Sequence, residues 1–156
     1  MVKDLIAKAV EELMGLERNS EAVELDEMTL KSSQRVLGPE QPFTLTGRSD
    51  RASRYAAQGR NAEAVKADER TLKASERALG PEHIFTLWSR THLAEGYRAL
   101  GRYAEAVELD EKTLAVREEV LGPDHPDTLT SRSNLARGYR ELGRNDEAEA
   151  LESGSS

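Results

Sequence analysis

Three aspartates stand where the sequence predicts buried helix faces. Asp26, Asp68 and Asp110 lie in the related stretches AVELDEMTL, AVKADERTL and AVELDEKTL. Ala106 and Val107 precede Asp110 by four and three residues, so a helix would place apolar side chains around this carboxylate. Carboxylates with perturbed pKa values act as acids and bases in active sites. A buried carboxylate is also costly unless it is paired, so acid–base chemistry and internal ion pairing are the two readings to weigh.

Repetition favours the structural interpretation, because catalysis needs one constellation of unlike groups. Arg90 lies twenty residues before Asp110, and the same spacing recurs elsewhere in the chain. A guanidinium can bond a carboxylate at two points. The spacing therefore predicts buried pairs, which are Arg48–Asp68, Arg90–Asp110 and Arg132–Glu152. Asp26 has Ile6 at the arginine position, so we expect it to use Arg48 or to stay partly hydrated.

Other residues that could do chemistry occur singly. His83 and His125 follow Gly-Pro-acid triplets and His92 lies within a predicted helix, so each is expected to be a capping or surface residue. The sequence has no H-E-x-x-H spacing, nucleophile elbow, phosphate-binding loop or dinucleotide glycine motif. We expect no enzymatic activity, no metal and no cofactor.

The elements that position these residues repeat along the chain. LGPE, LGPE and LGPD begin at residues 37, 79 and 121, a period of 42. Within each period, glycines and prolines separate two helical patterns, as at Gly101 and at Gly122–Pro123. A single helix pair cannot bury its apolar face alone, but stacked pairs can. The sequence predicts an all-α solenoid over residues 1–152, with units at 1–36, 37–78, 79–120 and 121–152, and a flexible tail or cloning remnant at 153–156.

Composition limits the partners. The formal net charge is −7, and clustered basic residues that would attract nucleic acid or an anionic membrane are absent. The chain has no cysteine, which excludes disulfides and thiolate metal sites. The N-terminal residues mix charges with apolar side chains, unlike a signal peptide or membrane span. We expect a soluble cytoplasmic protein.

A set of regularly placed residues resembles the tetratricopeptide repeat. The set is Leu93, Ala94, Tyr97, Gly101 and Ala106, matched 42 residues later by Leu135, Ala136, Tyr139, Gly143 and Ala148. The long period and LGPDHPDTL resemble the kinesin-light-chain-like subclass, and ELDEKTLAVRE is similar to arrays in bacterial, mostly actinobacterial, regulators. The resemblance implies a scaffold for protein–protein interaction. Arg51 at the position of Leu93, Gly47 within a helix, and Glu17 at the position of the turn glycine depart from the pattern.

The predicted partner-binding surface is the concave face of the third and fourth units. It comprises Trp88, Thr91, Glu95, Arg98, Ser133, Arg137 and Arg140. The arginines on this face could hold a carboxylate-bearing segment in a protein of negative net charge. Trp88 is either a binding anchor or a cover for the end of a neighbouring helix. The alternative function is self-assembly, for instance as a homodimer, through an apolar face at the end of the array.

Overall fold

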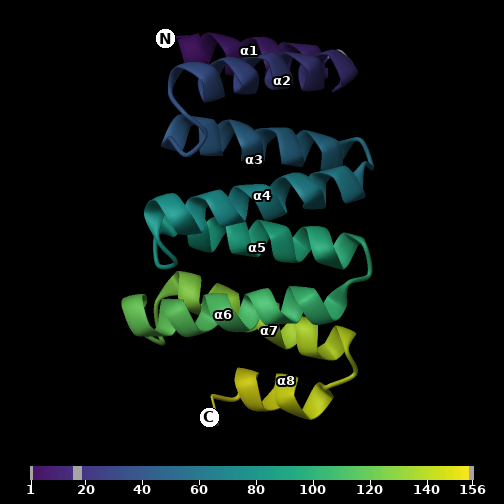
Figure 1. Cartoon of the computed structure of the whole chain (residues 1–156). Helices are drawn as coiled ribbons and strands as arrows, with labels where there is room; N and C mark the ends of the chain where they lie inside the picture. Colours follow the sequence, from purple (N-terminus) through teal and green to yellow (C-terminus); the bar gives the residue numbers. More distant parts are fainter. Residues whose placement is uncertain (1, 16–18, 155–156) are drawn as a thin grey trace. The chain divides into compact units, whose positions relative to one another are not determined.

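Eight α-helices make up the part of the chain that the computed structural model describes, which is the backbone of residues 2–15 and 19–154 and the side chains of residues 2–10 and 21–154. They are α1 (Val2–Gly15), α2 (Asn19–Val36), α3 (Pro42–Ala57), α4 (Asn61–Leu79), α5 (Ile84–Ala99), α6 (Tyr103–Leu121), α7 (Pro126–Glu141) and α8 (Asn145–Glu152). Short turns join α3 to α4, α5 to α6 and α7 to α8 as antiparallel pairs (Figure 1). No strand occurs within these ranges, so the all-α prediction is confirmed.

The chain divides into two compact units. Unit 1 comprises residues 1–74 and unit 2 comprises residues 75–156, so the division falls inside α4. Unit 1 contains α1 to α3, and unit 2 contains α5 to α8. The assignment of four repeats to one continuous domain remains a prediction. The different turn expected at Glu17 lies outside the described residues.

The helices begin and end where the punctuating residues predict. His83 and His125 are the N-terminal caps of α5 and α7, and the Nδ1 atom of each accepts a hydrogen bond from the backbone N–H two residues later. These bonds satisfy N–H groups that the first turn of a helix leaves unpaired. Gly101 lies in the turn between α5 and α6 with a φ of 72°, a left-handed conformation that favours glycine. The capping prediction for these two histidines is confirmed.

A tyrosine and an arginine fasten each turn between paired helices of unit 2. The Arg102 guanidinium lies 4.2 Å from the centre of the Tyr97 ring, and Arg144 lies 4.3 Å from that of Tyr139. A guanidinium at this distance is attracted to the face of an aromatic ring, although water weakens the attraction at exposed sites. The turn thereby brings the start of the second helix against the end of the first.

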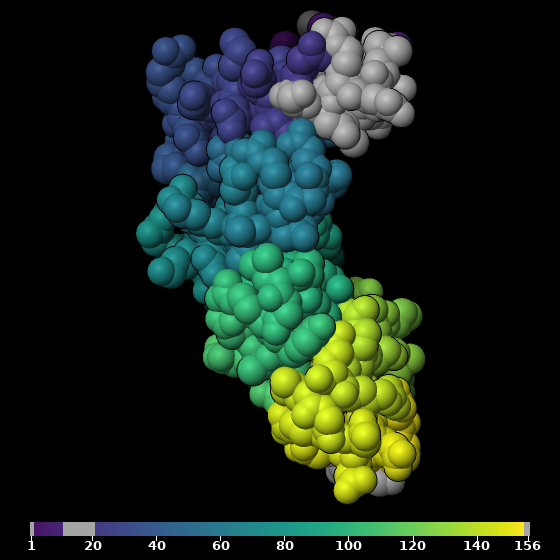
Figure 2. All heavy atoms as spheres, turned by 90° about the vertical axis from the view of Figure 1, so that its right-hand side faces the viewer, coloured from purple at the N-terminus to yellow at the C-terminus, as the bar shows by residue number. Residues whose placement is uncertain are grey.

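The core of unit 2 forms where α6 and α7 pack together. Val107, Leu114 and Leu135 are buried in one cluster, and Tyr139 and Leu151 pack against it. Side chains of α7 and α8, at the yellow end of the colour range, pack directly against one another (Figure 2). Because α6 packs against both α5 and α7, polar side chains of these three helices can meet.

The core of unit 1 contains a cluster of Val23, Tyr55 and Ala64. Arg51, which replaces a leucine of the repeat pattern, is half-buried, and its guanidinium lies 5.9 Å from the centre of the Tyr55 ring. The Tyr55 hydroxyl donates a hydrogen bond to Glu27 Oε1 at 2.6 Å. Throughout the described ranges, every helix is too short or too polar to cross a membrane.

Candidate functional site

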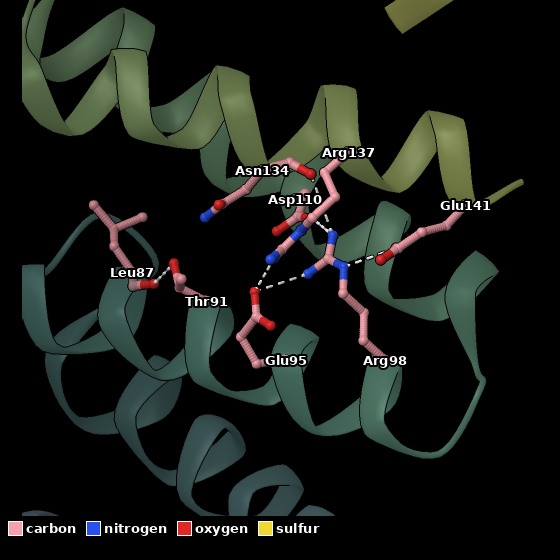
Figure 3. A network of polar contacts seen from close by, with 8 residues as sticks. All are labelled: Leu87, Thr91, Glu95, Arg98, Asp110, Asn134, Arg137 and Glu141. Atoms are coloured by element: carbon pink, nitrogen blue, oxygen red, sulfur yellow. Dashed lines mark hydrogen bonds and ion pairs between the residues drawn. The ribbon is translucent and has the colours of Figure 1, made fainter. Parts of the chain in front are cut away.

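Arg98 is the centre of a polar network that joins three helices of unit 2 (Figure 3). From α5, its guanidinium donates to the Asp110 carboxylate on α6 and, at 2.9 Å, to Glu141 Oε2 at the end of α7. It also donates to Glu95 Oε1 on its own helix and to the Asn134 carbonyl oxygen of α7, each at 3.3 Å. Four acceptors thus surround one guanidinium, as its planar array of donors permits.

A glycine of α7 leaves the space that this network needs. A Cβ atom at Gly138 would lie 2.6 Å from Val107 Cγ2 and 3.1 Å from the Arg98 Nη2 atom. Both distances are shorter than ordinary van der Waals contact. Gly138 therefore allows α7 to approach closely enough to cover the pair formed by Arg98 and Asp110. No prediction from the sequence had assigned this glycine a role.

Burial dominates the electrostatics of the pair. The Arg98 side chain is 7% exposed and that of Asp110 is 3% exposed. Burial raises the pKa of the Asp110 carboxyl, although the hydrogen bond from Arg98 opposes the rise. Burial alone would lower the pKa of Arg98, but the hydrogen bonds to Asp110 and Glu141 outweigh it and raise the pKa. The carboxylate is therefore held by its arginine inside the protein.

The predicted pair of Arg90 and Asp110 is wrong. Arg90 instead donates to Glu76 Oε1, across the preceding loop, at 2.8 Å. Arg90 was expected to pair with Asp110 because the two residues should lie at the same height along the antiparallel helices. The Arg90 side chain instead points from α5 towards the end of α4. Arg98 reaches Asp110 because helical side chains lean towards the N-terminus of their own helix. In antiparallel helices this lean brings the two charged groups together.

The predicted pair of Arg132 and Glu152 is wrong for the same reason. Arg132 donates to Glu118 at 2.8 Å, and Glu152 accepts from Arg140, with an Nη1–Oε1 distance of 2.9 Å. The actual spacings recur, fourteen residues for Glu76–Arg90 and Glu118–Arg132 and twelve for Arg98–Asp110 and Arg140–Glu152. These repeated spacings were visible in the sequence. The pair of Arg48 and Asp68 remains a prediction.

Asp26 also has a partner other than the expected one. The Arg54 Nε atom on α3 donates to the Asp26 carboxylate on α2, so neither Arg48 nor hydration alone accounts for this charge. Burial raises the pKa of Asp26, and the interaction with Arg54 opposes the rise. The general prediction of internal arginine–carboxylate pairing is supported, but with other arginines than those expected.

The predicted partner-binding residues divide into exposed and internal ones. Trp88 is exposed, with its ring 5.7 Å from that of Phe85 and stacked 5.2 Å from that of His92, measured between centres. The neighbouring Thr91 hydroxyl donates to the Leu87 carbonyl oxygen at 3.2 Å (Figure 3). Arg98 is internal and cannot present its guanidinium to a partner, which corrects the prediction for this residue.

The remaining arginines of this face are exposed but paired. Arg137 bonds Glu95, and Arg140 bonds Glu152. Ser133 on α7 is also exposed. The expected local excess of positive charge is therefore absent from this surface, because each arginine has a carboxylate beside it. Any anionic ligand has to exchange with one of these carboxylates.

The polar side chains of this surface that could do chemistry are engaged in hydrogen bonds within the protein. The buried carboxylate of Asp110 is bonded to Arg98, and the Thr91 hydroxyl bonds its own helix. Among the residues with described positions, no group of three or more His, Asp or Glu side chains could hold a metal ion.

Comparison with known proteins identifies the family of the repeats. Two family models described as tetratricopeptide repeat match the chain, one at residues 48–109 and 89–152 and the other at residues 12–43. The crystal structure of nearly identical TPR-like repeats from Podosopora anserina, designated a kinesin light chain, is 32% identical with a TM-score of 0.82, over 95% of this chain and 70% of that one. The crystal structure of a point variant of the same repeats is also 32% identical, with a TM-score of 0.83 and the same coverage.

A more distant structure shares the fold. BtubC (BKLC) from P. vanneervenii is 21% identical with a TM-score of 0.81, over 95% of this chain and 59% of that one. A search of curated proteins gives no match. The relatives agree with the helix-pair solenoid that the repeat pattern predicts.

Proposed function

The chain belongs to the tetratricopeptide repeat family, whose members generally mediate protein–protein interaction, and we propose that it is a binding scaffold for a segment of a partner protein. Solenoid repeats present extended surfaces that hold peptides. The bacterial regulatory arrays that the motifs resemble support a place within a larger bacterial regulator. The observation that carries the proposal is the exposed aromatic surface at Trp88.

The surface that supports binding combines an apolar anchor with an exchangeable ion pair. Phe85 and His92 pack on either side of Trp88 along one stripe of α5, which limits the freedom of the indole ring. A rigid exposed aromatic ring binds at low cost in conformational entropy. Further along the stripe, the Glu95–Arg137 pair is about half exposed, so a carboxylate of the partner could replace Glu95 on Arg137. The proposed ligand is a segment with one apolar and one acidic side chain.

The test begins with a pull-down that uses the chain as bait and continues with titration of the captured partner. We expect Trp88→Ala and Arg137→Glu each to weaken binding by about tenfold or more, as loss of a hot-spot residue implies. Lys112→Glu is the matched control, because it makes the same charge change at an exposed residue of α6. Unchanged affinity in both test variants, with the fold intact by circular dichroism, would move the site to the loops at residues 80–83 and 122–125.

Self-assembly is the second candidate, and the exposure of Leu129 favours it. Leu129 is 46% exposed on α7, whereas Leu45 and Leu87, at the same repeat position, are 0% and 4% exposed. A second copy could cover this apolar face. Light scattering over a range of concentrations tests the idea, with Leu129→Gln expected to abolish any dimer. A monomer at every concentration would exclude it.

A further inference from the structure

Unit 1 contains an open pocket among α1, α2 and α3. The pocket holds about 540 Å³ of space between side chains, part of it open to solvent. Ile6, Leu30 and Phe43 provide apolar walls, and Gly47 leaves room on the α3 side. The nearest atom to a Cβ built at Gly47 would be Leu30 Cδ1, at 3.7 Å. Because the pocket is open to solvent, a side chain of another molecule can enter it.

The hydroxyl groups of the pocket present acceptors. Thr29 donates to the Leu25 carbonyl oxygen, Ser33 to that of Leu30 and Thr46 to that of Pro42, at 2.9, 3.0 and 2.9 Å. A hydroxyl group has one hydrogen, and each of these hydrogens is already used within its own helix. Only the oxygen lone pairs remain for a molecule in the pocket. The ligand must therefore supply hydrogen-bond donors.

Asp50 is the charged group of the pocket that a further cation could approach. Two carboxylates, Asp26 and Asp50, and two cations, Lys3 and Arg54, line the pocket. Arg54 bonds directly to Asp26, which leaves the carboxylate of Asp50 for an added cation. Partial burial raises the pKa of the Asp50 carboxyl, against the attraction of Arg54 and Lys3. The ammonium of Lys3 lies 5.6 Å from the centre of the Phe43 ring, so the edge of the pocket already holds one cation.

Unit 2 shows what occupies the corresponding positions there. Arg117 stands 84 residues after Ser33, two repeat periods along the chain. Its Nη1 atom donates to the Ser131 hydroxyl at 2.7 Å and to the Asp127 carbonyl oxygen at 3.2 Å. Ser131 and Asp127 are the equivalents of Gly47 and Phe43. A guanidinium of the chain itself thus contacts, in unit 2, the positions that line an open pocket in unit 1.

We propose that the pocket of unit 1 binds the side chain of an arginine from a partner protein. The aliphatic part of that side chain would lie against Ile6, Leu30 and Phe43. The guanidinium would donate to the carboxylate of Asp50 and to the hydroxyl oxygens of the wall. This site is separate from the surface at Trp88, and the proposal does not depend on the function proposed for that surface.

The test is a titration of the ¹⁵N-labelled protein with n-butylguanidinium, followed by NMR. We expect saturable shifts of the amide signals of Leu30, Ser33, Thr46 and Gly47. Asp50→Asn should weaken binding about tenfold, as the loss of a hydrogen bond to a charged group implies. Ser33→Arg should remove the saturable shifts, because the new side chain fills the pocket as Arg117 does in unit 2.

Matched controls decide between this site and unspecific attraction. Glu24→Gln removes one exposed carboxylate from α2 outside the pocket and should leave the affinity unchanged, as should Trp88→Ala. Butyrate should cause no saturable shifts. Equal affinity for n-butanol, unchanged binding in folded Asp50→Asn, or absence of saturable shifts in the unaltered protein would each overturn the proposal.

Discussion

Asp26 in unit 1 and Asp110 in unit 2 occupy the same position of the repeat, yet each receives its arginine from a different helix. Arg54 reaches Asp26 from α3, the helix that follows α2. Arg98 reaches Asp110 from α5, the helix that precedes α6. In the sequence, Met14 stands at the position of Arg98, and Gly138 stands at the position of Arg54. Where one position carries arginine, the other does not.

The difference shows that both units keep a buried carboxylate that needs a hydrogen-bond donor, but they do not keep the same donor residue. A carboxylate inside a helix stack requires a donor, and either neighbouring helix can supply it. Space decides which one does. Gly138 has no side chain, so α7 can cover the Arg98–Asp110 pair, whereas in unit 1 the corresponding side chain of Arg54 fills that position itself. The net stability from such pairs is small, and we interpret their role as fixing the register of the helices.

The largest effect is expected from removing Arg98. Arg98→Ala leaves the Asp110 carboxylate buried without its donor, which should lower the free energy of unfolding by about 3–5 kcal/mol. Arg140→Ala is the matched control at the same repeat position, because Arg140 and Glu152 are 46% and 45% exposed. Its effect should be far smaller, since water screens an exposed pair and solvates the carboxylate left behind. Urea unfolding measures both, and equal losses would contradict the role assigned to burial.

Replacing a glycine by alanine should change the stability in opposite directions in the two units. Gly138→Ala places a methyl group against Val107 and Arg98, and the overpacking should cost about 1–3 kcal/mol. Gly47→Ala meets only Leu30 at ordinary contact distance, so higher helix propensity should stabilise the protein by up to about 1 kcal/mol. Thermal unfolding of the two variants tests this. A stabilising Gly138→Ala would show that α7 does not need the close approach.

A double variant should transfer the arrangement of unit 1 into unit 2. Arg98→Ala combined with Gly138→Arg places an arginine where Arg54 stands in unit 1. The free energy of unfolding of the double variant should be higher, by about 0.5–3 kcal/mol, than the sum of the two single-variant effects predicts. Recovery should be incomplete, because the new Cβ meets Val107. Gly138→Gln combined with Arg98→Ala is the uncharged control. An equal recovery of stability in this control would mean that charge pairing plays no part.

The smallest effect concerns pH. Burial raises the pKa of Asp110 above its ordinary value of 3.8, whereas the hydrogen bond from Arg140 lowers that of Glu152 below 4.5. The folded state thus favours protonated Asp110, whose contribution to stability is lost as the pH rises through its folded pKa. The contribution of Glu152 is present at higher pH and is lost as the pH falls through its folded pKa. Carbon-detected NMR titration of the two carboxyl groups measures both shifts, and a pKa of Asp110 below 3.8 or of Glu152 above 4.5 would contradict them.

The helices, their ends and their repetition were predictable from the sequence. Apolar spacing indicated the helix faces, and local chemistry set the boundaries, as at the caps His83 and His125 and the turn at Gly101. The need for a partner at Asp110 was predictable as well, because it follows from the cost of burying a charge. These properties depend on residues close together in the chain.

The identity of each partner was decided by tertiary structure. Arg90 and Asp110 lie nearly level on paired helices, but the direction of each side chain around its helix sends Arg90 to Glu76 and brings Arg98 to Asp110. The approach of α7 at Gly138 then turns Arg98 from a surface residue into an internal one. How far along its helix a residue lies can be counted from the sequence. The direction of its side chain around the helix axis and its distance to a third helix are set by packing. For this reason the sequence by itself determined which charges had to be paired, and only the packed helices decided by which arginine.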